Sequence, residues 1–87
     1  MRIQYHKNYL KSYQKRIALN VKLSYQLEQR LTLFFQNPRN PLLKDHRLVG
    51  KKKEYRAFSI TGDIRVIYKK FNDIILLYDI GTHNQVY

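Results

Sequence analysis

The sequence predicts an α+β fold, in which two N-terminal helices pack on one face of an antiparallel sheet. Three observations predict it. Apolar residues recur at three- and four-residue spacing between residues 9 and 35, as on one face of a helix. From residue 54 onward they alternate with polar residues, and the short turns between these segments favour an antiparallel meander. The 87 residues leave room for one core, so we expect a single domain spanning 1–87.

The N-terminal half is predicted to form one strand and two helices. Residues 2–5 alternate over a short stretch, as in a strand. One face of a first helix is lined at four-residue spacing by Tyr9, Tyr13 and Ile17. Asn20 is a suitable N-cap for a second helix, which ends before Pro38 because proline disfavours helical geometry in the preceding residue. The apolar stripe of that second helix consists of Leu23, Leu27, Leu31, Phe34 and Phe35.

A long polar connector, residues 37–53, precedes the strands of the meander. It exceeds the usual loop length, and loops this long are often functional. The three strands that follow are Glu54–Ile60, Ile64–Lys70 and Ile74–Ile80. The third is apolar enough to lie in the middle of the sheet. Because the two helices are the remaining amphipathic elements, we expect them to cover one face of this sheet.

The charge balance indicates a polyanionic partner. Seventeen Lys and Arg face six Asp and Glu, which gives a formal net charge of +11. So large a charge on so small a domain is costly through self-repulsion, and a polyanion would relieve it. Nucleic acid is the leading candidate, while an anionic membrane surface and an acidic protein are the alternatives.

Several features favour a cytoplasmic protein without a membrane partner. Cysteine is absent, which excludes disulfide and thiolate chemistry and suits a reducing compartment. The N-terminus lacks the apolar stretch and cleavage site of a secretion signal. The longest apolar run, residues 74–78, is far shorter than the roughly 20 residues that span a bilayer.

The residue pattern predicts neither a cofactor nor a metal site. The six carboxylates are scattered, the three histidines are far apart, and no HExxH or paired-Asp motif occurs. A glycine-rich phosphate loop is also missing from the sequence. What remains is a metal-free set that could act on a phosphodiester, namely His46, Asp63, Arg65, His83 and Tyr87.

These residue types suit the cleavage of RNA, whose own 2′-hydroxyl can attack the adjacent phosphate. The protein must then remove the 2′ proton, protonate the leaving 5′ oxygen and stabilise the charge on the phosphoryl group. Histidine suits both proton transfers because its reference pKa, about 6.5, is close to working pH. Arginine and lysine suit the third task as cations preorganised at the phosphoryl oxygens.

Each candidate residue also has a purely structural interpretation. A loop histidine such as His46 is often only solvated, and aspartate is favoured in turns such as the one that holds Asp63. Arg65 alternates with apolar neighbours and could simply face solvent from a strand. His83 and Tyr87 are four residues apart, which places them on one face of either a helical turn or a strand.

Four motifs follow one another in the second half of the chain. They are KDHRL at 44–48 with Gly50 after it, EYR at 54–56, GDIRVIY at 62–68 and GTHNQVY at 81–87. In this order they resemble the RelE/ParE toxin superfamily, and most closely its YafQ-type mRNA interferases. The resemblance implies a RelE-like β-α-α-β-β-β fold. It also implies a toxin of a type II toxin–antitoxin system, a ribosome-dependent endoribonuclease that cleaves messenger RNA in the ribosomal A site.

The resemblance also implies roles for the candidate residues. His83 is expected to transfer a proton directly, with His46 as the second acid or base. Asp63 would orient a partner or act as a base, and Tyr87 would position the substrate or stack on it. Arg65 matches the strand arginine that stabilises phosphate in RelE-like toxins. Which of the two histidines and Asp63 is the acid and which the base is left open.

Further positions concern RNA binding and departures from the family pattern. The residues expected to hold ribosomal or messenger phosphate are Lys51, Lys52, Lys53 and Arg56. Ser59 stands where YafQ-like proteins carry a further histidine. Ile64 stands where an aromatic residue is frequent. These two departures bear on base stacking and on the assignment of the acid and base roles, while the two outer histidines are retained.

A toxin that cuts messenger RNA requires a neutralising partner, so the resemblance implies a cognate antitoxin and a toxin–antitoxin hetero-oligomer. The charge of +11 predicts that this antitoxin is acidic. Two other functions are compatible with the sequence. One is a ParE-like toxin that inhibits DNA gyrase, although such chains generally lack the paired histidines. The other is a non-catalytic module that binds RNA or an acidic protein.

Overall fold

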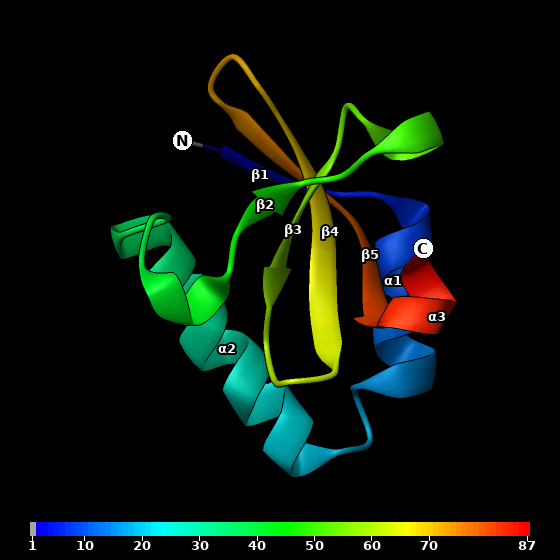
Figure 1. Cartoon of the computed structure of the whole chain (residues 1–87). Coiled ribbons are helices and arrows are strands. Elements are labelled where there is room, and N and C mark those ends of the chain that lie inside the picture. Colours follow the sequence, from blue (N-terminus) through cyan, green and yellow to red (C-terminus); the bar gives the residue numbers. More distant parts are fainter. Residues whose placement is uncertain (1) are drawn as a thin grey trace.

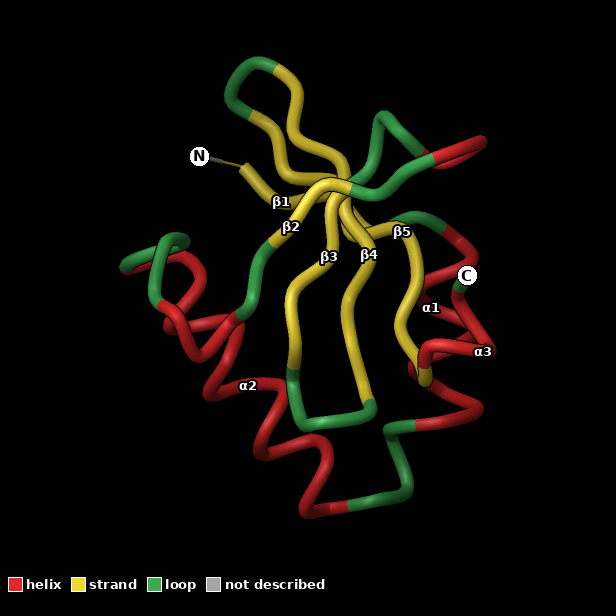
Figure 2. The backbone as a smooth tube through the Cα atoms, in the orientation of Figure 1, coloured by secondary structure: helices red, strands yellow, loops and turns green. Residues whose placement is uncertain are grey.

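The fold was determined as a computed structural model, which describes residues 2–87. Its helices are α1 (Lys7–Arg16), α2 (Val21–Gln36) and α3 (His83–Val86), with short 3₁₀ turns η1 (Pro41–Leu43) and η2 (Gly50–Lys52). Its strands are β1 (Arg2–Tyr5), β2 (His46–Arg47), β3 (Arg56–Ser59), β4 (Ile64–Phe71) and β5 (Ile74–Thr82). The α+β prediction is confirmed, and the two long helices lie beside the sheet (Figures 1 and 2).

The five strands form one mostly antiparallel sheet in the order β1-β5-β4-β3-β2. The predicted meander is present, because β3, β4 and β5 pair antiparallel with their neighbours in sequence. β1 is the exception: it pairs parallel to β5, with Arg2 opposite Ile74. Parallel neighbours require a long connection, and the helices and β2–β4 supply it between β1 and β5.

The larger core lies between the two long helices and one face of the sheet. Phe34 of α2 stacks on Phe58 of β3 with ring centroids 4.6 Å apart, and both side chains are buried. The expected cap is also present, since the Asn20 side chain accepts a hydrogen bond from the Leu23 amide at 3.0 Å. The buried residues of this core are Tyr9, Ile17, Leu27, Phe34, Leu43, Phe58, Ile60, Val66, Tyr68, Ile75, Leu77 and Ile80.

A smaller apolar cluster lies on the opposite face of the sheet. Its buried members are Leu48, Ala57, Ile67 and Val86. Successive strand residues point to opposite faces, so Val66 belongs to the larger core and Ile67 to the smaller cluster. The four-residue helix α3 is packed against β4 and β5 through Val86. We refer to this side of the sheet as the α3 face.

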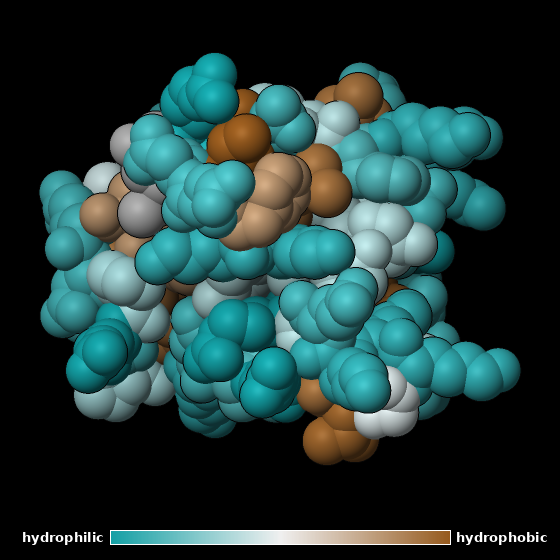
Figure 3. Space-filling view, turned by 90° about the horizontal axis from the view of Figure 1, so that it is seen from above, coloured by the Kyte–Doolittle hydropathy of each residue, from teal (hydrophilic) through white to brown (hydrophobic). Residues whose placement is uncertain are grey.

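The predicted connector, residues 37–53, is more ordered than a loop. It contains η1, the two-residue strand β2 and η2, and β2 pairs antiparallel with β3. The sequence did not predict β2 because two residues are too few to show a period of alternation. No helix within residues 2–87 is long and apolar enough to cross a membrane. Seen from above, the surface is mostly hydrophilic, with apolar groups between the polar side chains (Figure 3).

Candidate active site

Four of the five predicted catalytic residues lie on the α3 face. Arg65 belongs to β4, where strand alternation places it on the same face as Ile67. His46 begins β2 and pairs with Ala57, a member of the smaller cluster. His83 and Tyr87 come from α3 and its C-cap. Three segments distant in sequence therefore contribute to one site.

The helix α3 sets the relative positions of His83 and Tyr87. Thr82 and Gln85 form a capping box, in which the Gln85 side chain accepts a hydrogen bond from the Thr82 amide at 2.8 Å. The helical turn brings the rings of His83 and Tyr87 into edge-to-face contact, with centroids 4.3 Å apart. Val86 is 1% exposed and holds the helix to the sheet. The four-residue spacing thus corresponds to a helical turn and not to a strand.

Arg65 contacts both aromatic groups of α3. Its guanidinium lies over the Tyr87 ring, 5.5 Å from the centroid, and its Nη1 is 3.3 Å from Nδ1 of His83. Because a guanidinium can only donate, Nδ1 of His83 accepts and the ring proton resides on Nε2. The buried Nε of Arg65 has no hydrogen-bond partner within residues 2–87. The hydrogen-bonding capacity of Arg65 is therefore not fully used within the described residues.

The orientation of His46 is determined by the backbone just before it. Nδ1 of His46 is 2.9 Å from the carbonyl oxygen of Lys44, whose φ of 49° is in the left-handed region. Since a carbonyl can only accept, Nδ1 carries the proton and Nε2 is left as an acceptor. Nε2 lies 3.5 Å from the hydroxyl of Tyr87, at the limit of a hydrogen bond. Tyr87 thus links the two histidines, His46 through its hydroxyl and His83 through its ring.

A hollow of about 490 Å³ lies beside these groups. Its lining residues are His46, Arg47, Leu48, Val49, Lys51, Lys52, His83 and Tyr87. Cations and two apolar side chains thus surround the histidines, a combination that suits a phosphate and an unstacked base. Sequence reasoning did not identify Arg47, Leu48 and Val49. Arg47 and Leu48 belong to the KDHRL motif and Val49 follows it directly, so that motif was the signal that could have indicated them.

The three lysines of the predicted RNA-binding run differ in their surroundings. Lys52 is half-buried, and its ammonium donates a hydrogen bond to the carbonyl of Val86, tying η2 to the end of α3. Lys51 and Lys53 are exposed, and Lys51 lines the hollow. The lysine run therefore contains one lysine with a structural bond and two that face solvent.

Two predicted site residues lie apart from this cluster. Asp63 is exposed in the β3–β4 turn, where its amide donates to Oγ1 of Thr61 at 3.2 Å. Its carboxylate makes no hydrogen bond or ion pair with any residue from 2 to 87. Arg56 is on β3 but on the helix-covered side, with its Nε 3.0 Å from a carboxylate oxygen of Asp45. The fold brings neither side chain into contact with the two histidines.

The two departures from the family pattern occupy different faces. Ser59 pairs with Arg65 across β3 and β4, so its side chain shares the α3 face with the site. Ile64 packs against the larger core, on the other face. The serine therefore directly changes the surroundings of Arg65. Within residues 2–87, no group of three or more His, Asp or Glu side chains could hold a metal ion.

Comparison with known proteins identifies similar toxins. The family model described as a bacterial toxin of a type II toxin–antitoxin system, YafQ, matches residues 1–87. YafQ from E. coli strain BL21(DE3) is 28% identical with a TM-score of 0.77, over 100% of this chain and 99% of that one. A copper-bound mutant toxin from Helicobacter pylori is 28% identical with a TM-score of 0.81 over the same shares. YafQ in the E. coli DinJ–YafQ toxin–antitoxin complex is 30% identical with a TM-score of 0.73, over 98% and 94%. No curated protein sequence matches the chain.

Proposed function

The chain belongs to the YafQ family of type II toxin–antitoxin toxins, and we propose that it is a ribosome-dependent endoribonuclease that cleaves messenger RNA in the A site. One observation carries the proposal: Tyr87 links two histidines and Arg65 beside a hollow lined by lysines. A gyrase inhibitor or a passive binding module has no need for two histidines with complementary proton positions.

In the proposed reaction, Nε2 of His46 takes the proton of the RNA 2′-hydroxyl. The 2′ oxygen attacks the adjacent phosphorus, and the bond from phosphorus to the 5′ oxygen breaks. His83, protonated on both ring nitrogens, would supply the proton for that leaving oxygen from its Nε2. It is then left as the neutral imidazole, whose Nδ1 can accept the hydrogen bond of Arg65. The products are a 2′,3′-cyclic phosphate and a 5′-hydroxyl, so atoms and charge balance without a metal. The hydrogen bond from Nδ1 of His46 to the carbonyl of Lys44 supports the role of His46 as the base, because it leaves Nε2 as the acceptor.

Charge on the phosphoryl oxygens would be stabilised by the guanidinium of Arg65, which lies beside both His83 and Tyr87. Tyr87 would stack on the base next to the scissile bond, and the exposed Lys51 and Lys53 would bind flanking phosphates. Asp63 makes no contact with the histidines, so its proposed role is to bind or orient the substrate once RNA is present.

The proposal is tested on ribosomes programmed with a defined messenger RNA. We expect cleavage that requires ribosomes, with product ends of 2′,3′-cyclic phosphate and 5′-hydroxyl. A single 2′-deoxy nucleotide at the cleavage position should abolish it, because the nucleophile is then missing. Cleavage of the 2′-deoxy message would refute the mechanism. Inhibition of gyrase supercoiling without any messenger cleavage would favour the ParE-like alternative.

We further propose an acidic antitoxin as the cognate partner. E. coli YafQ has been crystallised with the antitoxin DinJ, and the net charge of +11 here would speed association with an acidic chain. A segment that is disordered alone could wrap the toxin and fold on binding. Co-expression with the product of the neighbouring gene, followed by affinity purification, should recover a stable complex. Recovery of the toxin alone, harmless to bacteria at full expression, would contradict it.

A further inference from the structure

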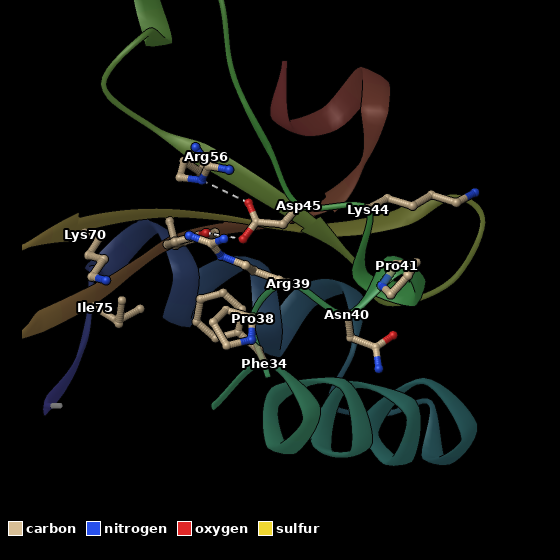
Figure 4. Close-up of a pocket in the computed structure, with 11 residues that line it drawn as sticks. Phe34, Pro38, Arg39, Asn40, Pro41, Lys44, Asp45, Arg56, Lys70 and Ile75 are labelled. Carbon is tan, nitrogen blue, oxygen red and sulfur yellow. Dashed lines mark hydrogen bonds and ion pairs between the residues drawn. The ribbon is translucent and has the colours of Figure 1, made fainter. Parts of the chain in front are cut away.

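Asp45, the residue just before His46, is held by two side chains from the sheet. Its Oδ1 accepts a hydrogen bond from Nε of Arg56 at 3.0 Å. Its Oδ2 accepts one from the hydroxyl of Tyr68 at 2.5 Å. Figure 4 shows Asp45 pointing toward Arg56, with their interaction drawn as a dashed line. We refer to these three residues as the Asp45 anchor.

The two residues that hold Asp45 belong to paired strands of the sheet. Tyr68 is 3% exposed and its ring packs edge-on against Phe34, with centroids 4.9 Å apart. Burial, and after it the bond to Asp45, raise the pKa of Tyr68 far above its usual range, so its hydroxyl stays protonated and donates. Arg56 belongs to β3, whose register with β4 places it directly opposite Tyr68. Both donors therefore come from paired strands of the sheet, and the Tyr68 ring is also held by the larger core.

The anchor and the candidate active site occupy opposite faces of the sheet. Tyr68 belongs to the larger core, and His46 lies on the α3 face, where it reaches Tyr87. The strand β2 that carries His46 has only two paired residues, too few to hold its own position firmly. The two hydrogen bonds to the carboxylate of the adjacent Asp45 are both charge-assisted, and they constrain the chain more strongly than that ladder does.

We propose that Asp45 is a positioning residue for His46, and that Arg56 and Tyr68 act through it. Fixing Asp45 fixes the turn of the chain at Lys44, and the carbonyl of Lys44 in turn holds Nδ1 of His46. Arg56 then contributes to catalysis without contacting RNA. The kinetic test of this inference rests on the proposed messenger cleavage, whereas the NMR test of the His46 ring does not.

The test compares Asp45→Asn with Glu54→Gln, which removes the same charge from an exposed side chain next to the anchor strand. Long-range ¹H–¹⁵N NMR reports which ring nitrogen of His46 carries the proton. We expect the Nδ1–H form to dominate in the parent and in Glu54→Gln, and to fall toward an even mixture in Asp45→Asn. In the same variant kcat should fall about tenfold or more with KM within twofold, because misplacement of a catalytic group lowers kcat.

Tyr68→Phe provides the second variant, since it keeps the buried ring and removes only the hydroxyl. It should produce a smaller change of the same kind, and it remains informative if Asp45→Asn does not fold. If Arg56 acts through Asp45, the kcat of the double variant Asp45→Asn/Arg56→Gln should be no lower than that of Asp45→Asn alone.

Two outcomes would overturn the inference. One is a folded Asp45→Asn protein with the parental His46 proton position and the parental kcat. The other is an Arg56→Gln protein with unchanged kcat, raised KM and a shallower salt dependence, which would assign Arg56 to RNA phosphate. If the parent cuts no messenger RNA, the proposed function fails, yet the NMR comparison still decides whether Asp45 positions His46.

Discussion

The salt dependence of RNA binding should distinguish the lysines that contact phosphate from the one that supports the fold. Lys51 and Lys53 are exposed, whereas the ammonium of Lys52 is bonded to the carbonyl of Val86. Each lysine that neutralises a phosphate of single-stranded RNA adds about 0.7 to the slope of log affinity against log salt. Lys51→Ala/Lys53→Ala should therefore lower that slope by about 1.4.

When salt rises from about 50 to about 200 mM, the affinity of the parent should therefore fall by a factor about seven times larger than the affinity of the double variant. The assay is equilibrium binding of a fluorescent 2′-deoxy-substituted RNA, which the protein cannot cut by 2′-hydroxyl attack. The matched control is Lys15→Ala/Lys22→Ala, which removes two exposed charges from α1 and its neighbour α2. An equal loss of slope in the control would mean that only total charge matters. An unchanged slope in Lys51→Ala/Lys53→Ala would refute the assignment and leave these lysines as solvated side chains.

Three further predictions concern α3 and its C-cap. His83→Ala should lower messenger cleavage by about 10² or more, the usual effect of losing a general acid or base, with little change in thermal stability because the side chain is exposed; equal cleavage by parent and variant would refute the role. Tyr87→Phe should lower kcat by less than about tenfold, because it keeps the ring contacts with His83 and Arg65 and loses only a 3.5 Å hydroxyl contact with His46. Tyr87→Ala should lower kcat further, because it also removes the ring. A larger loss in Tyr87→Phe than in Tyr87→Ala would contradict this role of the ring. Val86→Ala removes two buried methyl groups and should lower the free energy of unfolding by about 2 kcal/mol in urea titration, and a loss under about 0.5 kcal/mol would mean that α3 is not held by this contact.

The sequence alone was sufficient for the main architecture. The helical spacing of Tyr9, Tyr13 and Ile17 and the alternation after residue 54 reflect which side of an element is buried, and burial is a property that local sequence encodes. The N-cap at Asn20 was predictable for the same local reason, because the cap bonds an amide only three residues away. The ordered motifs also indicated the family, which the match over residues 1–87 bears out.

The boundaries that the sequence did not show are those of short elements. The strand β2 and the helix α3 have two and four residues, too few for a periodic pattern. The capping box of Thr82 and Gln85 was a readable signal for α3, since a threonine followed three residues later by glutamine is typical of a helix start.

The arrangement of the site was decided by tertiary structure. Sequence could name His46, Arg65, His83 and Tyr87 as candidates, but 41 residues separate the two ends of the bond between His46 and Tyr87. The strand register determines which face His46 and Arg65 occupy, and the packing of α3 against β4 and β5 places His83 and Tyr87 on that face. The same register turns Arg56 away from the histidines and toward Asp45, although Arg56 and the lysine run are close in sequence. Contacts of this kind depend on how strands pair and which face they present, and no local pattern of residues encodes that pairing.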